Sequence, residues 1–164
     1  MTRSGAGFAA ILLWGCGEAE TCPAPPEPMT AARAREMQPA LTQGLAGVTD
    51  RDLGPCSEPG MSCAEPTCGR RREAMTVFVV SAGGSLPVDA RCSPGLLRGE
   101  AEARAEIRLD SNALGEWVID LPEGLYGLFF APEGASCARC PEADLRSCWV
   151  EVERGTVALR ALTW

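Results

Sequence analysis

The chain contains no histidine and no lysine, and one tyrosine is present among its 164 residues. All fifteen basic residues are therefore arginines. Histidine is the usual general base near neutral pH and the commonest metal ligand, so its absence excludes Ser-His and Cys-His nucleophile pairs. No glycine-rich phosphate loop opens a helix either, because Gly83-Gly84 follows an apolar run without a helical pattern after it. We therefore expect a protein that is not an enzyme and that has no catalytic residues.

The sequence is also poor in positive charge, with a formal net charge of −7. An acidic chain with few aromatic residues is a poor binder of nucleic acid, and anionic lipid headgroups repel it. The basic cluster Arg70-Arg71-Arg72 is short and adjoins the predicted core. We expect it to be a solvated boundary segment, and we expect no nucleic-acid partner.

An apolar stretch from Gly7 to Trp14 follows Arg3 near the N-terminus, and Gly15 and Cys16 come next. This layout is typical of a secretory signal and is too short for a transmembrane helix. Leu13-Trp14-Gly15-Cys16 resembles the lipobox of bacterial lipoproteins. The resemblance implies a signal peptide over 1–15, lipidation of the Cys16 thiol by a diacylglycerol with fatty acids such as palmitate, and a lipid anchor in the cell envelope. Gly17 after the cysteine favours the outer membrane over the inner one. The alternative is a short buried helix with Cys16 as an ordinary thiol.

Nine cysteines are present, and eight remain when Cys16 is set aside as a lipid carrier. An even number suits four disulfides in an oxidising compartment. Eight cysteines allow 105 pairings, so the sequence leaves the connectivity open. The disulfide candidates are Cys22, Cys56, Cys63, Cys68, Cys92, Cys137, Cys140 and Cys148.

The run Cys137-Ala-Arg-Cys140-Pro141 keeps two other interpretations open. A Cys-x-x-Cys pair can be a dithiol redox site, which would make the chain a secreted thiol–disulfide protein. Cys137, Cys140 and Cys148 with one more cysteine could instead form a Cys₄ zinc site. Cys148 is close enough in sequence to pair with either Cys137 or Cys140, so structural disulfides are the preferred reading and no cofactor or metal is expected. Carboxylates near strand ends suit a weak calcium site, with solvated acids as the default: Asp110, Asp120, Glu123 and Glu133.

The N-terminal part of the chain has little periodicity. Four prolines between Pro23 and Pro28 favour extended backbone. Thr30 can cap a helix over Ala31–Met37, and Pro39 interrupts the pattern, so Thr30–Gly47 is expected to hold one or two helical turns or disorder. Residues 16–54 are therefore expected to form a tether, and residues 55–73 an irregular Cys-rich segment.

From Met75 onward, short apolar runs with alternating polarity are punctuated by turn residues, as in β-strands. Seven short strands in about ninety residues indicate an antiparallel β-sandwich over 74–164. The expected strands are Met75–Ala82, Leu86–Cys92, Ala103–Leu109, Glu116–Leu121, Leu125–Ala131, Cys148–Glu153 and Thr156–Leu162.

The run Leu109-Asp-Ser-Asn-Ala-Leu-Gly-Glu-Trp-Val-Ile-Asp-Leu-Pro-Glu-Gly-Leu-Tyr126 resembles the carboxypeptidase-regulatory-like, or transthyretin-like, family. Several residues of this run have a clear structural role. Asp110 and Asn112 can close a turn through their side chains. Gly115 can take a backbone angle that other residues resist, and the Tyr126 hydroxyl can form a hydrogen bond with nearby backbone. The resemblance implies an all-β, seven-stranded Greek-key sandwich (prealbumin-like). Such domains are usually accessory or adhesive modules, so it also implies binding of an unidentified protein or carbohydrate, or a spacer role.

Overall fold

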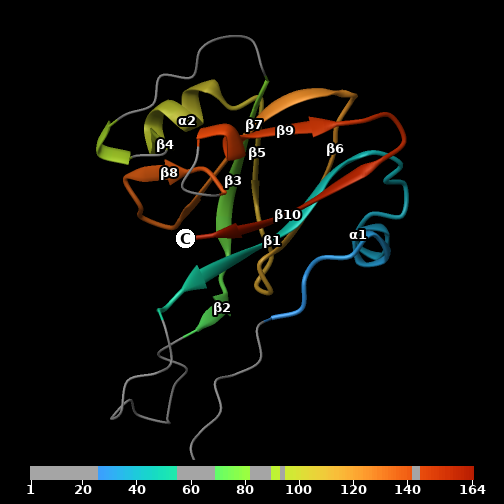
Figure 1. Cartoon of the computed structure of the whole chain (residues 1–164), viewed down its shortest axis with the longest axis horizontal. Helices are drawn as coiled ribbons and strands as arrows, with labels where there is room; N and C mark the ends of the chain where they lie inside the picture. The colour runs from blue at the N-terminus through green and yellow to red at the C-terminus, as the bar shows by residue number, and fades with distance from the viewer. Residues whose placement is uncertain (1–25, 55–68, 82–89, 93–94, 142–144) are drawn as a thin grey trace, which may run out of the picture.

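Two β-sheets make up most of the computed structural model, which describes residues 26–54, 69–81, 90–92, 95–141 and 145–164 (Figure 1). Sheet A contains β1 (Gly44–Asp52), β2 (Arg70–Arg72), β6 (Glu116–Asp120) and β10 (Val157–Thr163). Sheet B contains β3 (Met75–Ser81), β4 (Gly95–Leu97), β5 (Ile107–Asp110), β7 (Gly124–Pro132), β8 (Cys137–Arg139) and β9 (Trp149–Val152). Two short α-helices, α1 (Ala31–Met37) and α2 (Arg98–Arg104), and two 3₁₀ turns, η1 (Ala90–Cys92) and η2 (Leu145–Cys148), complete the described elements.

Strand order in the two sheets does not follow the order of the chain. In sheet A, β1 is central: it pairs with β10 in parallel on one side and with β6 and β2 in antiparallel on the other. The expectation of an antiparallel sandwich is therefore wrong for the pair β1 and β10. In sheet B, β3 lies between β5 and β7, and β9 and β8 pair with the beginning and the end of β7. The chain therefore crosses between the sheets several times, which brings distant segments together.

The main hydrophobic core lies between the sheets. Sheet A contributes Leu45, Trp117 and Leu162, all at most 1% exposed, and sheet B contributes inward-facing side chains such as Val77 and Phe130. Burial of apolar surface stabilises the fold by about 25 cal/mol per Å². This shared core makes the two sheets a β-sandwich.

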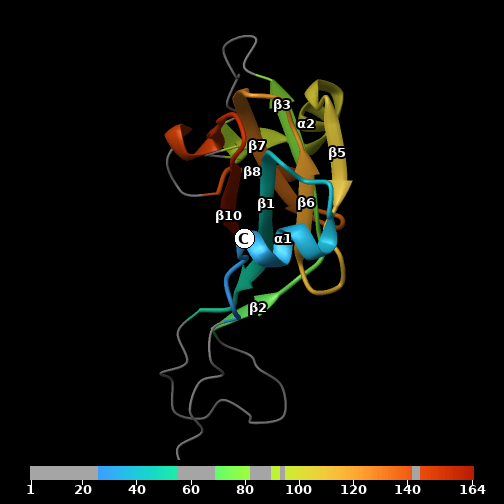
Figure 2. The same cartoon turned by 90° about the vertical axis from the view of Figure 1, so that its right-hand side faces the viewer.

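Both sheets are also covered on their outer faces. On sheet B, the side chains that alternate with the core residues, among them Phe78 and Phe129, pack against Ala101 of α2 and two cysteines. On sheet A, Ala46 and Val48 pack beneath α1 together with Met29 and Leu41. Figure 2 shows α1 lying across this face of the sheet. Central strands are consequently buried on both sides.

A buried hydroxyl network connects the two sheets at one end. Thr49 of β1 donates a hydrogen bond from its Oγ1 to the Glu73 carbonyl at 2.5 Å. Its Oγ1 also lies 2.9 Å from Ser111 Oγ, which accepts a hydrogen bond from the Met75 backbone N–H at 2.8 Å. Buried polar groups are costly unless they are paired, and this network pairs groups of β1, β3 and the turn after β5.

Most of the strands expected from alternation are present in the described part of the chain. The runs expected at Met75–Ala82, Glu116–Leu121, Leu125–Ala131, Cys148–Glu153 and Thr156–Leu162 correspond to β3, β6, β7, β9 and β10. The helix over Ala31–Met37 is also confirmed, because Thr30 Oγ1 accepts a hydrogen bond from Arg33 N at 3.1 Å as its N-cap.

Asn112, Gly115 and Tyr126 have the roles that the sequence predicts for them. Asn112 Oδ1 accepts hydrogen bonds from the backbone N–H groups of Leu114 and Glu116, both at 2.9 Å. Gly115 has a φ of +68°, and the Tyr126 hydroxyl donates to the Pro122 carbonyl at 3.1 Å. Asp110 differs from the expectation, because its carboxylate accepts from Thr76 Oγ1 at 2.7 Å across the sheet.

Two of the expected strands are wrong in part. Ala103 and Arg104 end helix α2, and β5 begins only at Ile107. Strong helix formers fill the sequence Arg-Gly-Glu-Ala-Glu-Ala-Arg apart from its glycine, and ion pairs link Arg98 to Glu102 and Glu100 to Arg104 at i, i+4 spacing. In the run expected at 86–92, residues 90–92 form the 3₁₀ turn η1, and residues 86–89 lie outside the described residues.

The segment expected to be a tether contains the longest strand of sheet A. Strand β1 falls within residues 16–54, and β2 within residues 55–73. Seven consecutive residues of β1 are buried, because β1 is covered by α1 on one face and by the core on the other. A strand buried on both faces has no polar alternation, so the period-two signal is missing from its sequence.

Candidate functional site

Four of the cysteine candidates form two disulfides around strand β8 of sheet B. Cys92 in η1 bonds Cys137 in β8, with their Cα atoms 5.4 Å apart. Cys140, just after β8, bonds Cys148 at the end of η2, with a Cα separation of 4.7 Å. Three of these cysteines are at most 4% exposed, and Cys137 is half-buried. The bridges join η1 to β8 and the chain after β8 to η2, and Cys140 and Cys148 pack in the apolar cluster on the outer face of sheet B.

This pairing argues against the two alternatives for the Cys-x-x-Cys motif, a dithiol redox site and a Cys₄ zinc site. Cys137 and Cys140 are each bonded to a different partner, so the Cys137–Cys140 bond that the redox interpretation requires is not formed. The same two bonds engage the three sulfurs proposed for a Cys₄ zinc site. Within the described ranges, no group of three or more Cys, Asp or Glu side chains is placed to hold a metal ion. The remaining predicted site residues lie outside the described residues: Cys16, Cys22, Cys56, Cys63 and Cys68.

A polar cavity of about 360 Å³ opens at the edge of sheet B, where β3 begins and β5 and β7 end. Its lining carries two charges of each sign: it consists of Ala74, Met75, Thr76, Arg98, Arg108, Asp110 and Glu133. Asp110 and Glu133 were two of the four carboxylates considered for calcium. The two arginines beside them make this cavity unlike a calcium site, which collects oxygen ligands of negative charge.

Arg98 organises the cavity, because its guanidinium bonds groups from several elements. Nη1 donates to the Pro132 carbonyl at 2.7 Å, Nη2 to Thr76 Oγ1 at 3.3 Å, and Nε to Glu102 at 3.1 Å. The guanidinium also lies 5.9 Å from the ring centroid of Phe78. The Arg108 side chain is 54% exposed, and its Nη1 lies 3.9 Å from Glu102 Oε1. The cavity can recognise a small polar ligand by charge and hydrogen bonding, but it holds no activated nucleophile or matched acid–base pair.

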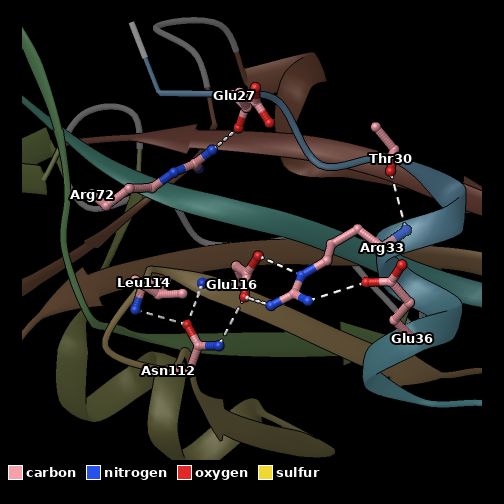
Figure 3. A network of polar contacts seen from close by, with 8 residues as sticks. All are labelled: Glu27, Thr30, Arg33, Glu36, Arg72, Asn112, Leu114 and Glu116. Carbon is pink, nitrogen blue, oxygen red and sulfur yellow. Dashed lines mark hydrogen bonds and ion pairs between the residues drawn. The ribbon is translucent and has the colours of Figure 1, made fainter. Parts of the chain in front are cut away.

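A second cluster of charged residues fastens α1 to sheet A (Figure 3). Arg33 Nε and Nη2 donate to the two carboxylate oxygens of Glu116 in β6, both at 2.9 Å, and Arg33 Nη1 donates to Glu36 at 3.2 Å. Asn112 Nδ2 donates to Glu116 at 3.0 Å. Hydrogen bonds from Arg33 and then Asn112 lower the pKa of Glu116 to about 2, and hydrogen bonds from Glu116 and Glu36 raise the pKa of Arg33. Sequence patterns did not indicate this pair, since 83 positions separate its members.

The arginines of β2 also take part in specific contacts. Arg72 Nη1 lies 3.2 Å from Asp50 Oδ1, and Asp50 is 4% exposed. Burial raises the pKa of Asp50, and the positive charges of Arg72 and Arg70 oppose that rise. Arg72 also donates to the Glu27 carbonyl, as the upper left part of Figure 3 shows. Arg70 and Arg71 are exposed, as expected of a solvated segment, whereas Arg72 is partly buried.

The described residues thus form a mostly β, two-sheet domain with two disulfides. No protein-family model matches the sequence, and searches of curated proteins and of solved structures found no significant match. Among the helices described, none is long and apolar enough to cross a membrane. The functional assignment therefore depends on the residues themselves.

Proposed function

We propose that this chain is a lipid-anchored lipoprotein of the bacterial cell envelope that displays a disulfide-stabilised β-sandwich for a binding or structural role, without catalysis. The observation that carries the proposal is the pair of disulfides in the domain. Stable disulfides belong to oxidising compartments outside the cytosol, which is where a lipobox signal directs a protein. Cys16 carries the lipid. Gly17 directly after it favours anchoring in the outer membrane over the inner one.

Placement of the domain near the membrane follows from the length of chain available. Residues 17–25 separate Cys16 from the first described residue, and a fully extended chain of that length reaches roughly 35 Å. The anchored domain would therefore remain close to the membrane surface. The polar cavity beside Arg98 is a candidate position for a small polar ligand in the described part of the domain.

The strand order supports a finer assignment of the domain to a transthyretin-like Greek-key sandwich. Seven strands have four or more residues among those described, and they divide into β6-β1-β10 and β9-β7-β3-β5. The chain passes from β5 to β6 in the opposite sheet and back to β7 beside β3. Sequential hairpins do not give such an order, whereas Greek-key sandwiches do. An experimental structure in which β1 does not lie between β6 and β10 would refute this assignment.

Intact-mass analysis of the membrane fraction tests the anchor. We expect a chain that begins at Cys16, carries diacylglycerol and has its eight other cysteines oxidised. The variant Cys16→Ser should lose the lipid and leave the membrane fraction, while Cys22→Ser, the same exchange six positions later, should keep both. A full-length, unlipidated soluble protein with free thiols would overturn the proposal.

A redox role has less support, and a direct measurement separates it from a structural one. Titration with a mild thiol reductant should leave both described bridges intact, because three of the four cysteines are almost fully buried. Rapid reduction followed by a Cys137–Cys140 bond would favour the thiol–disulfide alternative instead.

A further inference from the structure

Charges of opposite sign line the polar cavity at the edge of sheet B without neutralising one another. Arg98, Arg108, Asp110 and Glu133 all border this cavity. In the described part of the chain neither carboxylate forms an ion pair, and both arginines are instead paired with Glu102 of α2, which does not line the cavity. The cavity therefore offers both signs of charge to a ligand at separate positions.

Strand β5 determines how far apart two of these charges begin. Arg108 and Asp110 are two residues apart in this strand, so their side chains project from the same face. They lie opposite Phe78 and Thr76 of β3, and Phe78 belongs to the apolar cluster on the outer face of sheet B. The Cα atoms of Arg108 and Asp110 are thus about 7 Å apart, and no ion pair joins the two side chains.

Hydrogen bonds hold one wall of the cavity in place before any ligand enters. Thr76 Oγ1 donates to Asp110 Oδ1 at 2.7 Å and accepts from Arg98 Nη2 at 3.3 Å. Arg98 Nη1 donates to the carbonyl of Pro132, the residue before Glu133, at 2.7 Å. Among the described residues, no donor engages the second carboxylate oxygen of Asp110, so this oxygen can accept from a ligand. A wall fixed in this way loses little freedom when it binds.

Of the two arginines, Arg108 is the one available to an anionic group. Its side chain is 54% exposed, and the 3.9 Å between its Nη1 and Glu102 Oε1 is too long for a hydrogen bond. The Arg98 side chain is 19% exposed, and its Nε already donates to Glu102 at 3.1 Å. A guanidinium with free N–H groups binds a carboxylate through two parallel hydrogen bonds. Arg108 can therefore hold a carboxylate while Asp110 and Glu133 hold a cation.

We propose that this cavity binds a small zwitterion of the free α-amino acid class, with its carboxylate on Arg108 and its ammonium group on Asp110 and Glu133. The volume of about 360 Å³ is near the lower end of the range for ligand sites, which suits a molecule of this size. A ligand with a single charge leaves one wall of the cavity without a partner. The inference rests on the binding role proposed above and is independent of the lipid anchor.

Titration of the full chain, purified in mild detergent, with three probes of similar size tests this proposal. The probes are alanine, alaninamide, which lacks the negative charge, and lactate, in which a hydroxyl replaces the ammonium group. NMR shifts of the backbone amides of Thr76, Arg108 and Asp110 report binding at the cavity. We expect a dissociation constant on the order of 1 mM for alanine, because the probe has few atoms. Alaninamide and lactate should each bind about tenfold more weakly, because each loses one charge-assisted contact.

Two variants assign each charge of the ligand to its wall. Arg108→Gln should weaken alanine about tenfold without weakening alaninamide, which has no carboxylate to lose. Asp110→Asn should weaken alanine and alaninamide without weakening lactate. Arg104→Gln and Asp120→Asn are the matched controls, since they remove the same charges outside the cavity and should leave alanine binding unchanged. Wild-type thermal unfolding of each variant shows that a change in binding is not a loss of folding.

The pattern across the probes decides the outcome. A wild type that gives no saturable shift with alanine, or that binds all three probes equally, would overturn the proposal. Alaninamide binding as tightly as alanine would also overturn it, because the cavity would then be a site for cations alone. These results are distinct from a failure of the anchor, since an unlipidated chain keeps the same cavity and the mass analysis described above tests the lipid separately.

Discussion

The ion pair between Arg33 and Glu116 should make the stability of the domain depend on pH in a specific way. Glu116 accepts three hydrogen bonds, two from Arg33 and one from Asn112, and its side chain is 14% exposed. We consider the variant Glu116→Gln, which keeps the size of the side chain and removes its charge. The variant loses the bidentate contact that fastens α1 to β6.

The magnitude follows from the pKa. A fall from 4.5 in the unfolded chain to about 2 in the folded one corresponds to at most about 3 kcal/mol of stability. Arg33 is 43% exposed, and solvent screening reduces such contributions, so we expect a loss of about 1–2 kcal/mol for Glu116→Gln at neutral pH. Because the folded pKa is depressed, this stabilisation is complete above pH 4.5 and is lost as the pH falls toward 2.

Urea unfolding of the wild type and of Glu116→Gln, followed by tryptophan fluorescence at several pH values, measures this difference. The two proteins should differ in free energy of unfolding at neutral pH and converge in acid. Glu123→Gln serves as the control, since Glu123 pairs with an arginine that is 81% exposed and should contribute under about 0.5 kcal/mol. A difference for Glu116→Gln that stays constant from neutral pH to pH 2, or that equals the control, would refute the reasoning.

Three further predictions concern stability measured by urea unfolding. Gly47→Ala should cost more than about 2 kcal/mol, because a Cβ would lie 2.1 Å from the Arg160 carbonyl oxygen; an unchanged midpoint would contradict this close approach. Tyr126→Phe should cost about 1 kcal/mol through loss of its backbone hydrogen bond, and a neutral result would show that this bond contributes nothing. Cys137→Ser, which opens a bridge spanning 45 residues, should cost about 4 kcal/mol, against about 2.5 for Cys140→Ser with its span of 8; the opposite order would exclude loop entropy as the main cause.

Alternation in the sequence predicted the strands that retain a polar or partly exposed side. In β6, Trp117 and Ile119 face the core while Glu116 and Asp120 are at its ends. This alternation of apolar and polar residues predicts a strand correctly. Strand β1 has no such pattern, because α1 and the core cover both of its faces. Its glycines lower the apparent strand propensity further, although Gly47 is required by the close approach of β10 and Trp117.

Helix α2 shows the opposite error: alternating polar and apolar residues predicted a strand where the helix ends. Arg104, Glu106 and Arg108 alternate with apolar residues, which is the period of a strand. The first of them nevertheless belongs to a helix, since Glu100 and Glu102 place ion-pair partners at i, i+4 spacing and Ala101 is buried against sheet B. The helical pattern over Arg98–Arg104 and the alternating pattern over Ala103–Leu109 overlap at two residues, and burial of Ala101 against sheet B favours the helix there.

For the disulfides, the sequence predicted which cysteines are candidates but not how they pair, because the pairing depends on how the elements around β8 are arranged. The antiparallel register of β4 and β8 places Leu97 opposite Cys137, and this arrangement brings η1 and Cys92 within bonding distance. Each of these elements has three residues and cannot bury a core of its own. These short elements therefore depend on the disulfides, whereas the longer strands of the two sheets are held by their shared core. On this reasoning the cysteines stabilise an addition to the sandwich, which explains why they stand outside the motif from Leu109 to Tyr126 that suggested the fold.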